Sequence, residues 1–197
     1  MKTLIIHPED STTTFLSQIY ANLKNKTVVK SDVSKSELRK LIESQDRVLM
    51  LGHGSPWGLL NLGQFPDPDS YIIDDSMVLP LKNKNNNLFI WCEADQFVVR
   101  HRLTGLNSGM FISQDTEASY YGFDNMDWGL IEQSNYRIAS IVSKYLNEPM
   151  EILYQKLQVE YGFIAKNNPI ARFNLERLYL TRPRTNKNPI KAVAVQK

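Results

Sequence analysis

The sequence predicts an α/β fold in which a mostly parallel sheet is flanked by helices and followed by a helical C-terminal extension. In the first half of the chain, short apolar runs alternate with stretches of helical apolar spacing, a pattern typical of parallel strands joined by crossover helices. The runs contain few polar residues, as expected of strands that are buried on both faces. From Asp127 onward the spacing is helical, which predicts the C-terminal extension.

The first fifty-one residues predict three strands and two helices. The strands are the apolar runs at residues 4–6, 28–29 and 48–51. Ser11 or Thr12 caps the first helix, in which apolar residues four apart lie on one face. In the second helix, Ser34 and Glu37 have the spacing of a capping box.

Between residues 55 and 112 the pattern is less regular. We expect a surface loop at 55–70, a small hairpin at 71–79, a fourth buried strand at 88–91, a helix at 94–103 and a fifth strand at 110–112. In the hairpin, residues 71–73 pair with residues 77–79 across a turn at 74–76.

Three capping signals divide the C-terminal part into helices. Asp127 caps a long helix, Pro149 opens a second, and Asn168 followed by Pro169 opens a third at residues 170–178. We expect one domain at residues 1–180, with a core at about 1–147, an extension at 148–180 and a basic, loose tail at 181–197. Within the tail, Val193 and Val195 are candidates for a short strand.

Composition narrows the classes of function. Of the 197 residues, 42% are hydrophobic and 22% charged, which excludes a disordered or fibrous chain. The net charge is only +2, so we expect neither a nucleic-acid nor a membrane partner. A single cysteine, Cys92, excludes an internal disulfide. The N-terminal apolar run is too short for a signal peptide, and we expect a cytoplasmic protein.

Two chemically reactive residues directly follow predicted strands. His53 follows the third strand and Cys92 ends the fourth, and functional residues of a parallel sheet gather at the C-terminal ends of its strands. A thiol can attack a carbonyl carbon while an imidazole moves the proton. Gly54 lets the backbone approach a substrate closely, so its N–H and that of Cys92 are candidate oxyanion donors.

The same residues carry a resemblance to a known family. An apolar block that ends in His-Gly, at residues 48–54, precedes a second apolar block that ends in Cys, at residues 88–93. This order resembles the caspase-like (clan CD) cysteine peptidases, and Cys92-Glu93 is most similar to the CHAT and related bacterial branches. The resemblance covers roughly residues 1–147 and implies a caspase-like, flavodoxin-like sheet.

By that resemblance, the protein is a cysteine hydrolase that cleaves a peptide or protein substrate without a cofactor. Cys92 is then the nucleophile and His53 the general acid and base, with Gly54 as an oxyanion donor. Candidates for the substrate pocket are Glu93, Asp95 and Trp91. The clan usually has a small or acidic residue where Trp91 stands, so the alternative is an inactive, caspase-like interaction module.

Other interpretations remain open at this stage. Arg100 and Arg102 would favour an acidic substrate, whereas an acid at Glu93 or Asp95 would favour a basic one. Cys92 could also be a buried structural thiol. A flavodoxin-like relay protein would use acids after the first strand, where only Glu9 and Asp10 stand. We expect no metal site, because the acids at 67, 69, 74 and 75 lack the spacing of a calcium loop.

Overall fold

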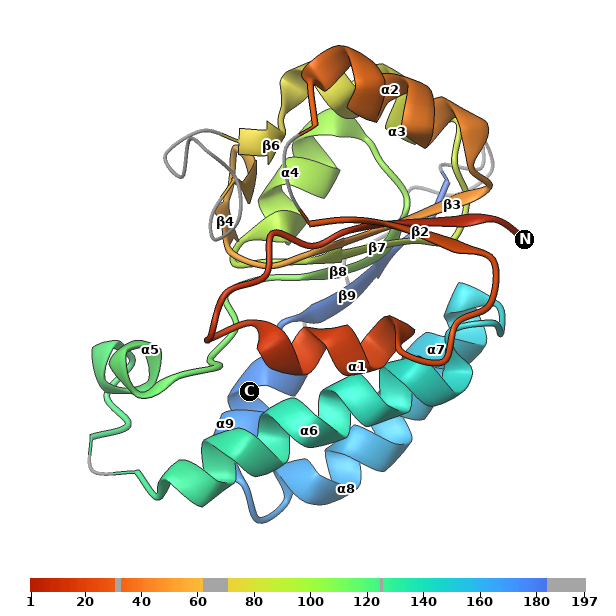
Figure 1. Cartoon of the computed structure of the whole chain (residues 1–197). Helices are drawn as coiled ribbons and strands as arrows, with labels where there is room; N and C mark the ends of the chain where they lie inside the picture. The colour runs from red at the N-terminus through yellow and green to blue at the C-terminus, as the bar shows by residue number, and fades with distance from the viewer. Residues whose placement is uncertain (31–32, 62–70, 125, 184–197) are drawn as a thin grey trace.

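The computed structural model has one six-stranded sheet between two layers of helices (Figure 1). It describes residues 1–30, 33–61, 71–124 and 126–183. The strand order is β2-β1-β3-β7-β8-β9, and only β9 runs antiparallel to its neighbour. The strand bounds are β1 Thr3–Ile6, β2 Lys26–Val29, β3 Arg47–Leu51, β7 Asn87–Ile90, β8 Gly105–Ser108 and β9 Leu178–Thr181. The predicted α/β class and mostly parallel sheet are confirmed.

Helices cover both faces of this sheet. Leu4 and Ile6 of β1 face one helical layer, whereas Ile5 faces the other, as the alternation of a strand requires. The first layer contains α2 (Lys35–Ser44), α3 (Val78–Lys82) and α4 (Ala94–His101). The second contains α1 (Ser17–Tyr20), α6 (Trp128–Tyr145), α7 (Met150–Lys156), a π-helical turn (Leu157–Tyr161), α8 (Gly162–Ala165) and α9 (Pro169–Leu175). A short helix, α5 (Asp115–Tyr120), projects beside the C-terminal ends of the parallel strands (Figure 1).

The helix caps follow the sequence signals closely. Ser34 and Glu37 form the complete capping box of α2, and Asp127 caps α6 by accepting a hydrogen bond from the Gly129 N–H. Asn168 accepts from the N–H of Ala171 and caps α9. The first helix differs from prediction. It begins as a 3₁₀ turn at Thr14–Leu16. The side chain of the N-cap residue, Thr13, makes no capping hydrogen bond.

The predicted hairpin at 71–79 is wrong in its second arm. β6 (Tyr71–Ile73) pairs with β5 (Gly58–Leu60), which pairs with β4 (Gly54–Ser55) in a separate three-stranded sheet. Asp74 accepts a hydrogen bond from the Ser76 N–H and caps a 3₁₀ turn at Asp75–Met77 that leads into α3. A side-chain cap therefore starts a helix where apolar residues suggested a strand. Residues 62–70 of the predicted loop lie outside the described residues.

The fifth parallel strand is Gly105–Ser108, not the predicted residues 110–112. At Gly105 (φ +144°) an added Cβ would lie 2.2 Å from the Asn87 carbonyl oxygen, so the close strand pairing requires glycine. Hydrogen bonds hold the Asn107 amide nitrogen and the Ser108 hydroxyl of this strand, whereas the buried Asn107 Oδ1 has no hydrogen-bond partner among the described residues. Asn107 donates to Gly105 and Thr181, and the Ser108 hydroxyl donates to the Trp91 carbonyl.

The helical extension also ends earlier than predicted. α9 stops at Leu175, and residues 178–181 form β9, which pairs with β8 from Gly105↔Thr181 to Ser108↔Leu178. The proposed strand at Val193 and Val195 lies outside the described residues. Within the described ranges, no helix combines the length and apolar content that crossing a bilayer requires.

Candidate active site

The strands that carry His53 and Cys92 are parallel neighbours. β3 and β7 pair from Leu49↔Leu88 to Leu51↔Ile90, and the Gly52 N–H donates to the Ile90 carbonyl 3.1 Å away. Leu51 and Ile90 both face the α1 and α6 side of the sheet. His53 comes two residues after Leu51, and Cys92 comes two residues after Ile90. Because side chains alternate along a strand, both residues are expected at the same edge of the sheet and on that same side.

Asp10 and Thr12 hold the imidazole of His53. Nε2 of His53 lies 2.7 Å from Thr12 Oγ1 and 3.1 Å from Asp10 Oδ2. The Thr12 hydroxyl donates its proton to Asp10 Oδ1 at 2.7 Å, so its oxygen is left to accept from Nε2–H. Both partners of Nε2 are therefore acceptors, which places the ring proton on Nε2 and leaves the lone pair on Nδ1.

The carboxylate of Asp10 organises the loop that follows β1. Oδ1 accepts hydrogen bonds from the N–H groups of Thr12 and Thr13 and from both hydroxyls. Burial opposes ionisation, but the Thr12 hydrogen bonds and the nearby His53 hold the pKa of Asp10 below its ordinary value. Asp10 is thus an ionised acceptor beside His53.

Sequence reasoning did not assign Asp10 to this site. Its position follows from strand order, because β1 is hydrogen-bonded to β3 and both strands end at one edge. The one signal in the sequence that could have indicated this role was the position of the Asp10 carboxylate, four residues after the first strand. Glu9 is not part of the arrangement, since it pairs with Lys30.

Cys92 stands at a sharp turn between β7 and α4. Glu93 has a left-handed backbone (φ 65°) and is the N-cap residue of α4, a conformation that costs energy for a residue other than glycine. The Cys92 thiol contacts the Phe111 carbonyl oxygen at 3.8 Å. Among the described residues, no hydrogen bond joins this thiol to the His53 ring.

The thiol is protonated in the resting protein. Burial, together with the charges of Glu117 and Glu93, raises the pKa of Cys92 to about 12. The N-terminus of the helix that follows Cys92 favours the thiolate. Desolvation and the two carboxylates outweigh that influence.

Trp91 and Gly54 pack against each other on the opposite side of the sheet from Cys92. The indole is 1% exposed, stacks edge-on between Phe89 and Phe97, and donates from Nε1 to the Ser55 carbonyl. An added Cβ at Gly54 would lie 2.0 Å from the indole ring. Trp91 therefore supports the His53–Gly54 turn from within the core instead of lining an open pocket.

The hairpin β4–β5 leaves the Gly54 N–H pointing away from its partner strand. The Leu60 N–H donates to the His53 carbonyl at 2.8 Å, so residues 53 and 60 are a hydrogen-bonded pair. In an antiparallel ladder such pairs alternate with non-bonded ones. Gly54, opposite Leu59, belongs to a non-bonded pair.

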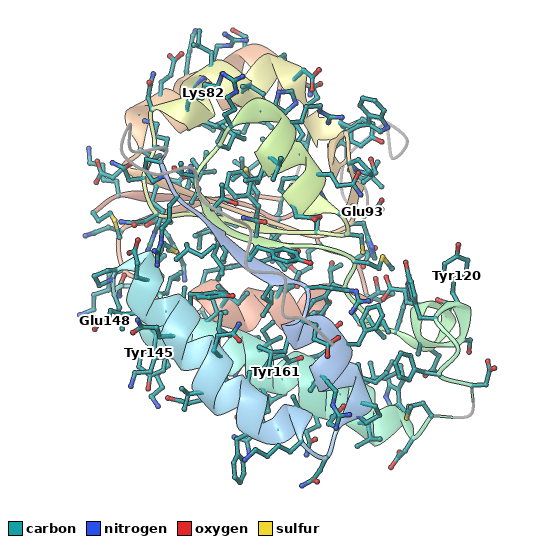
Figure 2. All side chains as sticks on the ribbon, turned by 180° about the vertical axis from the view of Figure 1, so that it is seen from behind. Lys82, Glu93, Tyr120, Tyr145, Glu148 and Tyr161 are labelled. Atoms are coloured by element: carbon teal, nitrogen blue, oxygen red, sulfur yellow. The ribbon has the colours of Figure 1, made fainter. Side chains whose placement is uncertain are left out.

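The other candidate pocket residues lie on or before α4. Glu93 accepts from the Gln96 amide at 3.1 Å and lies just before α4, on the side of the molecule where α5 carries Tyr120 (Figure 2). Asp95 is half-buried, and burial raises its pKa. Arg100 instead stacks on Trp57, 4.4 Å from the ring centroid, and donates to the Pro56 carbonyl.

Of the acids at 67, 69, 74 and 75, the two that the structure describes form ion pairs. Asp74 pairs with Lys35 at 2.6 Å, and Asp75 pairs with His101 at 2.9 Å. The acids at 67 and 69 lie outside the described residues. In the part of the chain that the structure describes, no three His, Cys, Asp or Glu side chains gather as a metal-binding group.

No protein-family model matches this chain, and no curated protein matches it at a significant level.

Proposed function

We propose that this protein is a caspase-like cysteine hydrolase that cleaves peptides, with Cys92 as nucleophile and His53 as general acid and base. One observation carries the proposal: β3 and β7 pair in register, so that both residues follow at the same edge and on the same side of the sheet. The sequence resemblance to clan CD peptidases supports the same assignment. In this proposal Asp10 is a positioning residue for His53.

The chemistry proceeds in two steps. Nδ1 of His53 takes the proton of the Cys92 thiol as the sulfur attacks the carbonyl carbon, and the resulting oxyanion accepts from the N–H groups of Gly54 and Cys92. His53 then gives the proton to the leaving amine, and the C–N bond breaks to leave a thioester. In the second step His53 takes a proton from water, which attacks the thioester and releases the acid and the free thiol.

The protonated resting thiol determines when the reaction can begin. Because the pKa of Cys92 is about 12, almost no thiolate exists at neutral pH. Attack therefore depends on proton transfer to His53 once a carbonyl is present, and not on a preformed ion pair. The ionised Asp10 beside Nε2 stabilises the imidazolium that this transfer creates.

A peptide library with every residue type at the cleaved position tests the proposal. We expect turnover by the wild-type protein that is lost in Cys92→Ala and His53→Ala, with circular dichroism and thermal unfolding of each variant recorded in parallel. His101→Ala is the matched control, because it removes a second partly buried histidine that pairs with Asp75. Cleavage after Arg or Lys would assign Glu93 or Asp95 to the pocket, and cleavage after Asp would assign Arg100 or Arg102.

A second candidate is an inactive, caspase-like interaction module. The observation that favours it is the desolvated thiol with its raised pKa, which is the state of a structural cysteine. This candidate predicts no turnover of any peptide. It also predicts that Cys92→Ala lowers stability by about 1 kcal/mol or more, because removing a buried sulfur leaves a cavity.

A further inference from the structure

The segment at residues 111–113, shortly after β8, is buried although it forms neither helix nor strand. Phe111, Ile112 and Ser113 are all buried. A buried backbone outside regular structure needs side chains as hydrogen-bond partners, because an unpaired N–H or C=O loses its hydration without compensation. The partners of this segment come from four elements that lie far apart in the sequence.

Asn174 of α9 binds both backbone groups of Ile112. Its Oδ1 accepts from the Ile112 N–H at 2.8 Å, and its Nδ2 donates to the Ile112 carbonyl at 2.9 Å. Nδ2 also donates to the Ser134 hydroxyl of α6 at 3.2 Å, and the Asn174 side chain is fully buried. A side-chain amide can make this double contact because it carries one acceptor and one donor group. Asn174 therefore takes the place that a neighbouring strand would have beside Ile112.

Asn135 of α6 holds the next residue of the segment. Its Nδ2 donates to the Ser113 carbonyl at 2.9 Å, whereas its buried Oδ1 has no hydrogen-bond partner in the part of the chain that the structure describes. Burying an unpaired oxygen costs stability, so helix packing alone does not account for an asparagine at this position. The need of the Ser113 carbonyl for a donor does account for it. On its other side, the Ser113 N–H donates to Glu117 of α5 at 2.7 Å.

The same segment contacts the Cys92 thiol and anchors one of its charged neighbours. The sulfur lies 3.8 Å from the Phe111 carbonyl oxygen, one residue before Ile112. The carboxylate of Glu117, which contributes to the raised pKa of the thiol, is bonded to Ser113, one residue after Ile112. The side chain of Ile112 packs on the helical extension, against Ile131, Ile170 and Phe173. The extension thus holds the part of the chain that faces the sulfur.

We propose that Asn174 and Asn135 are positioning residues for Cys92, because by holding residues 111–113 they set where the Phe111 carbonyl stands against the sulfur. Without these amides the segment moves, the sulfur loses its hydrogen-bond acceptor and water reaches it. The thiol is then more accessible, but its direction toward a bound carbonyl is no longer fixed. The consequence for peptide cleavage rests on the proposed function, whereas the consequence for the surroundings of the thiol does not.

Alkylation of Cys92 by iodoacetamide, at several urea concentrations well below the unfolding midpoint, tests the positioning role. Asn174→Leu keeps a side chain of similar shape but removes its hydrogen bonds. We expect it to raise the urea-independent rate by about tenfold, the change in thiolate fraction that a fall of one pKa unit gives. Local opening exposes little surface, so its rate hardly depends on urea, whereas alkylation through global unfolding rises with urea. A loss of stability alone therefore cannot give the expected result.

Asn168→Leu is the matched control, because Asn168 is a second buried asparagine, at the start of the same helix. It also makes three hydrogen bonds, to Leu130, Gln133 and Ala171, and none of them reaches residues 111–113. This variant should lower stability and leave the urea-independent alkylation rate at the wild-type value. Equal rates in the two variants, or a rate in Asn174→Leu that increases only with urea, overturn the proposal. If Asn174→Leu does not fold, Asn135→Ala decides, since it removes one hydrogen bond only, and an unchanged urea-independent rate in it overturns the proposal as well.

Peptide cleavage separates this proposal from the proposed function. In a protein that cleaves peptides, Asn174→Leu and Asn135→Ala should lower kcat by about tenfold or more and leave KM nearly unchanged, because small misplacements of a reacting group are costly. Slower cleavage together with faster alkylation identifies a nucleophile that is accessible but misplaced. An unchanged kcat in both variants overturns the positioning role. A wild-type protein that cleaves no peptide contradicts the proposed function, and the alkylation rates then decide alone whether the two asparagines position the thiol.

Discussion

The carboxylate of Asp10 lies 3.1 Å from Nε2 of His53 and ties the end of β1 to the end of β3. The contact crosses two neighbouring strands and fixes the ring proton on Nε2, because the Thr12 hydroxyl already donates to Asp10. The loop after β1 and the candidate base are thus one hydrogen-bonded unit. The effect of the Asp10–His53 contact on catalysis can be measured separately from its effect on stability.

Replacing Asp10 by Asn should lower kcat/KM for peptide cleavage by about 100-fold, within the range contributed by general acid–base groups. The amide keeps an acceptor for the loop but loses the negative charge that stabilises imidazolium. Glu9→Gln is the control, since it removes a neighbouring charge that pairs with Lys30 instead. Equal kcat/KM values for the Asp10→Asn and wild-type proteins would contradict the positioning role.

Alkylation of Cys92 by iodoacetamide should be slower at pH 7–8 than that of a free thiol, because burial raises the thiol pKa to about 12. Glu117→Gln should accelerate the alkylation a few-fold, because it lowers the pKa of the thiol. If it lowered the pKa by a full unit, the rate would rise by about tenfold at most. The amide oxygen can still accept from the Ser113 N–H, as the carboxylate does at 2.7 Å. Alkylation as fast as in the unfolded chain would disprove the raised pKa.

The same pKa shift predicts a loss of stability in alkaline solution. Between pH 9, the ordinary thiol value, and about 12, the unfolded chain releases the Cys92 proton while the folded protein retains it. The free energy of unfolding therefore falls as pH rises through this window. Urea titrations of wild type and Cys92→Ser should diverge there, because the serine variant lacks this contribution. Parallel curves would show that the folded thiol titrates normally.

Gly54→Ala should destabilise the protein by about 2 kcal/mol or more, since the new Cβ would lie 2.0 Å from the Trp91 ring and 2.6 Å from the Gly58 carbonyl oxygen. The strain falls on the turn that carries His53, so peptide cleavage should fall as well. Gly162→Ala is the control, because there the added Cβ meets only an ordinary contact with Leu175 at 3.5 Å. Thermal unfolding compares the two, and equal losses would refute the packing argument.

His7 predicts a loss of stability in mild acid. Burial lowers the pKa of its ring to about 4, and Nδ1 lies 2.9 Å from the Tyr20 hydroxyl. Below pH 6.5 the unfolded chain binds a proton that the folded protein excludes until about pH 4, so stability falls across this window, by on the order of 2–3 kcal/mol. Urea titrations at pH 7 and 4.5 should show that the free energy of unfolding falls less in His7→Asn than in the wild-type protein. An undiminished drop would assign the acid sensitivity to other groups.

The apolar strands and the capped helices were predictable because their signals are local. Val48–Leu51 and Leu88–Ile90 are apolar runs, and Ser34, Asp127 and Asn168 cap helices through residues two or three positions away. Placing His53 and Cys92 at strand ends followed from the same runs. That the two strands are neighbours is a property of the whole sheet, and the structure shows it.

The missed features depend on contacts that are distant in sequence. Gly105–Ser108 forms a strand between β7 and β9 because Asn107 and Ser108 find partners in Thr181 and Trp91, which no local pattern reveals. Asp10 reaches His53 across 43 residues of sequence. The raised pKa of Cys92 has a related origin, since burial and the carboxylate of Glu117 come from the folded chain.

Covalent labelling by peptidyl acyloxymethyl ketones tests most directly whether His53 and Cys92 act as one hydrolytic pair. A panel that varies the residue before the reactive group should modify the wild-type protein at Cys92, detected by intact-mass and peptide mass spectrometry. The account predicts labelling that is faster than with iodoacetamide and is at least about tenfold slower in His53→Ala and Asp10→Asn. Absence of labelling by every member of the panel, or labelling at the same rate in His53→Ala, would contradict it.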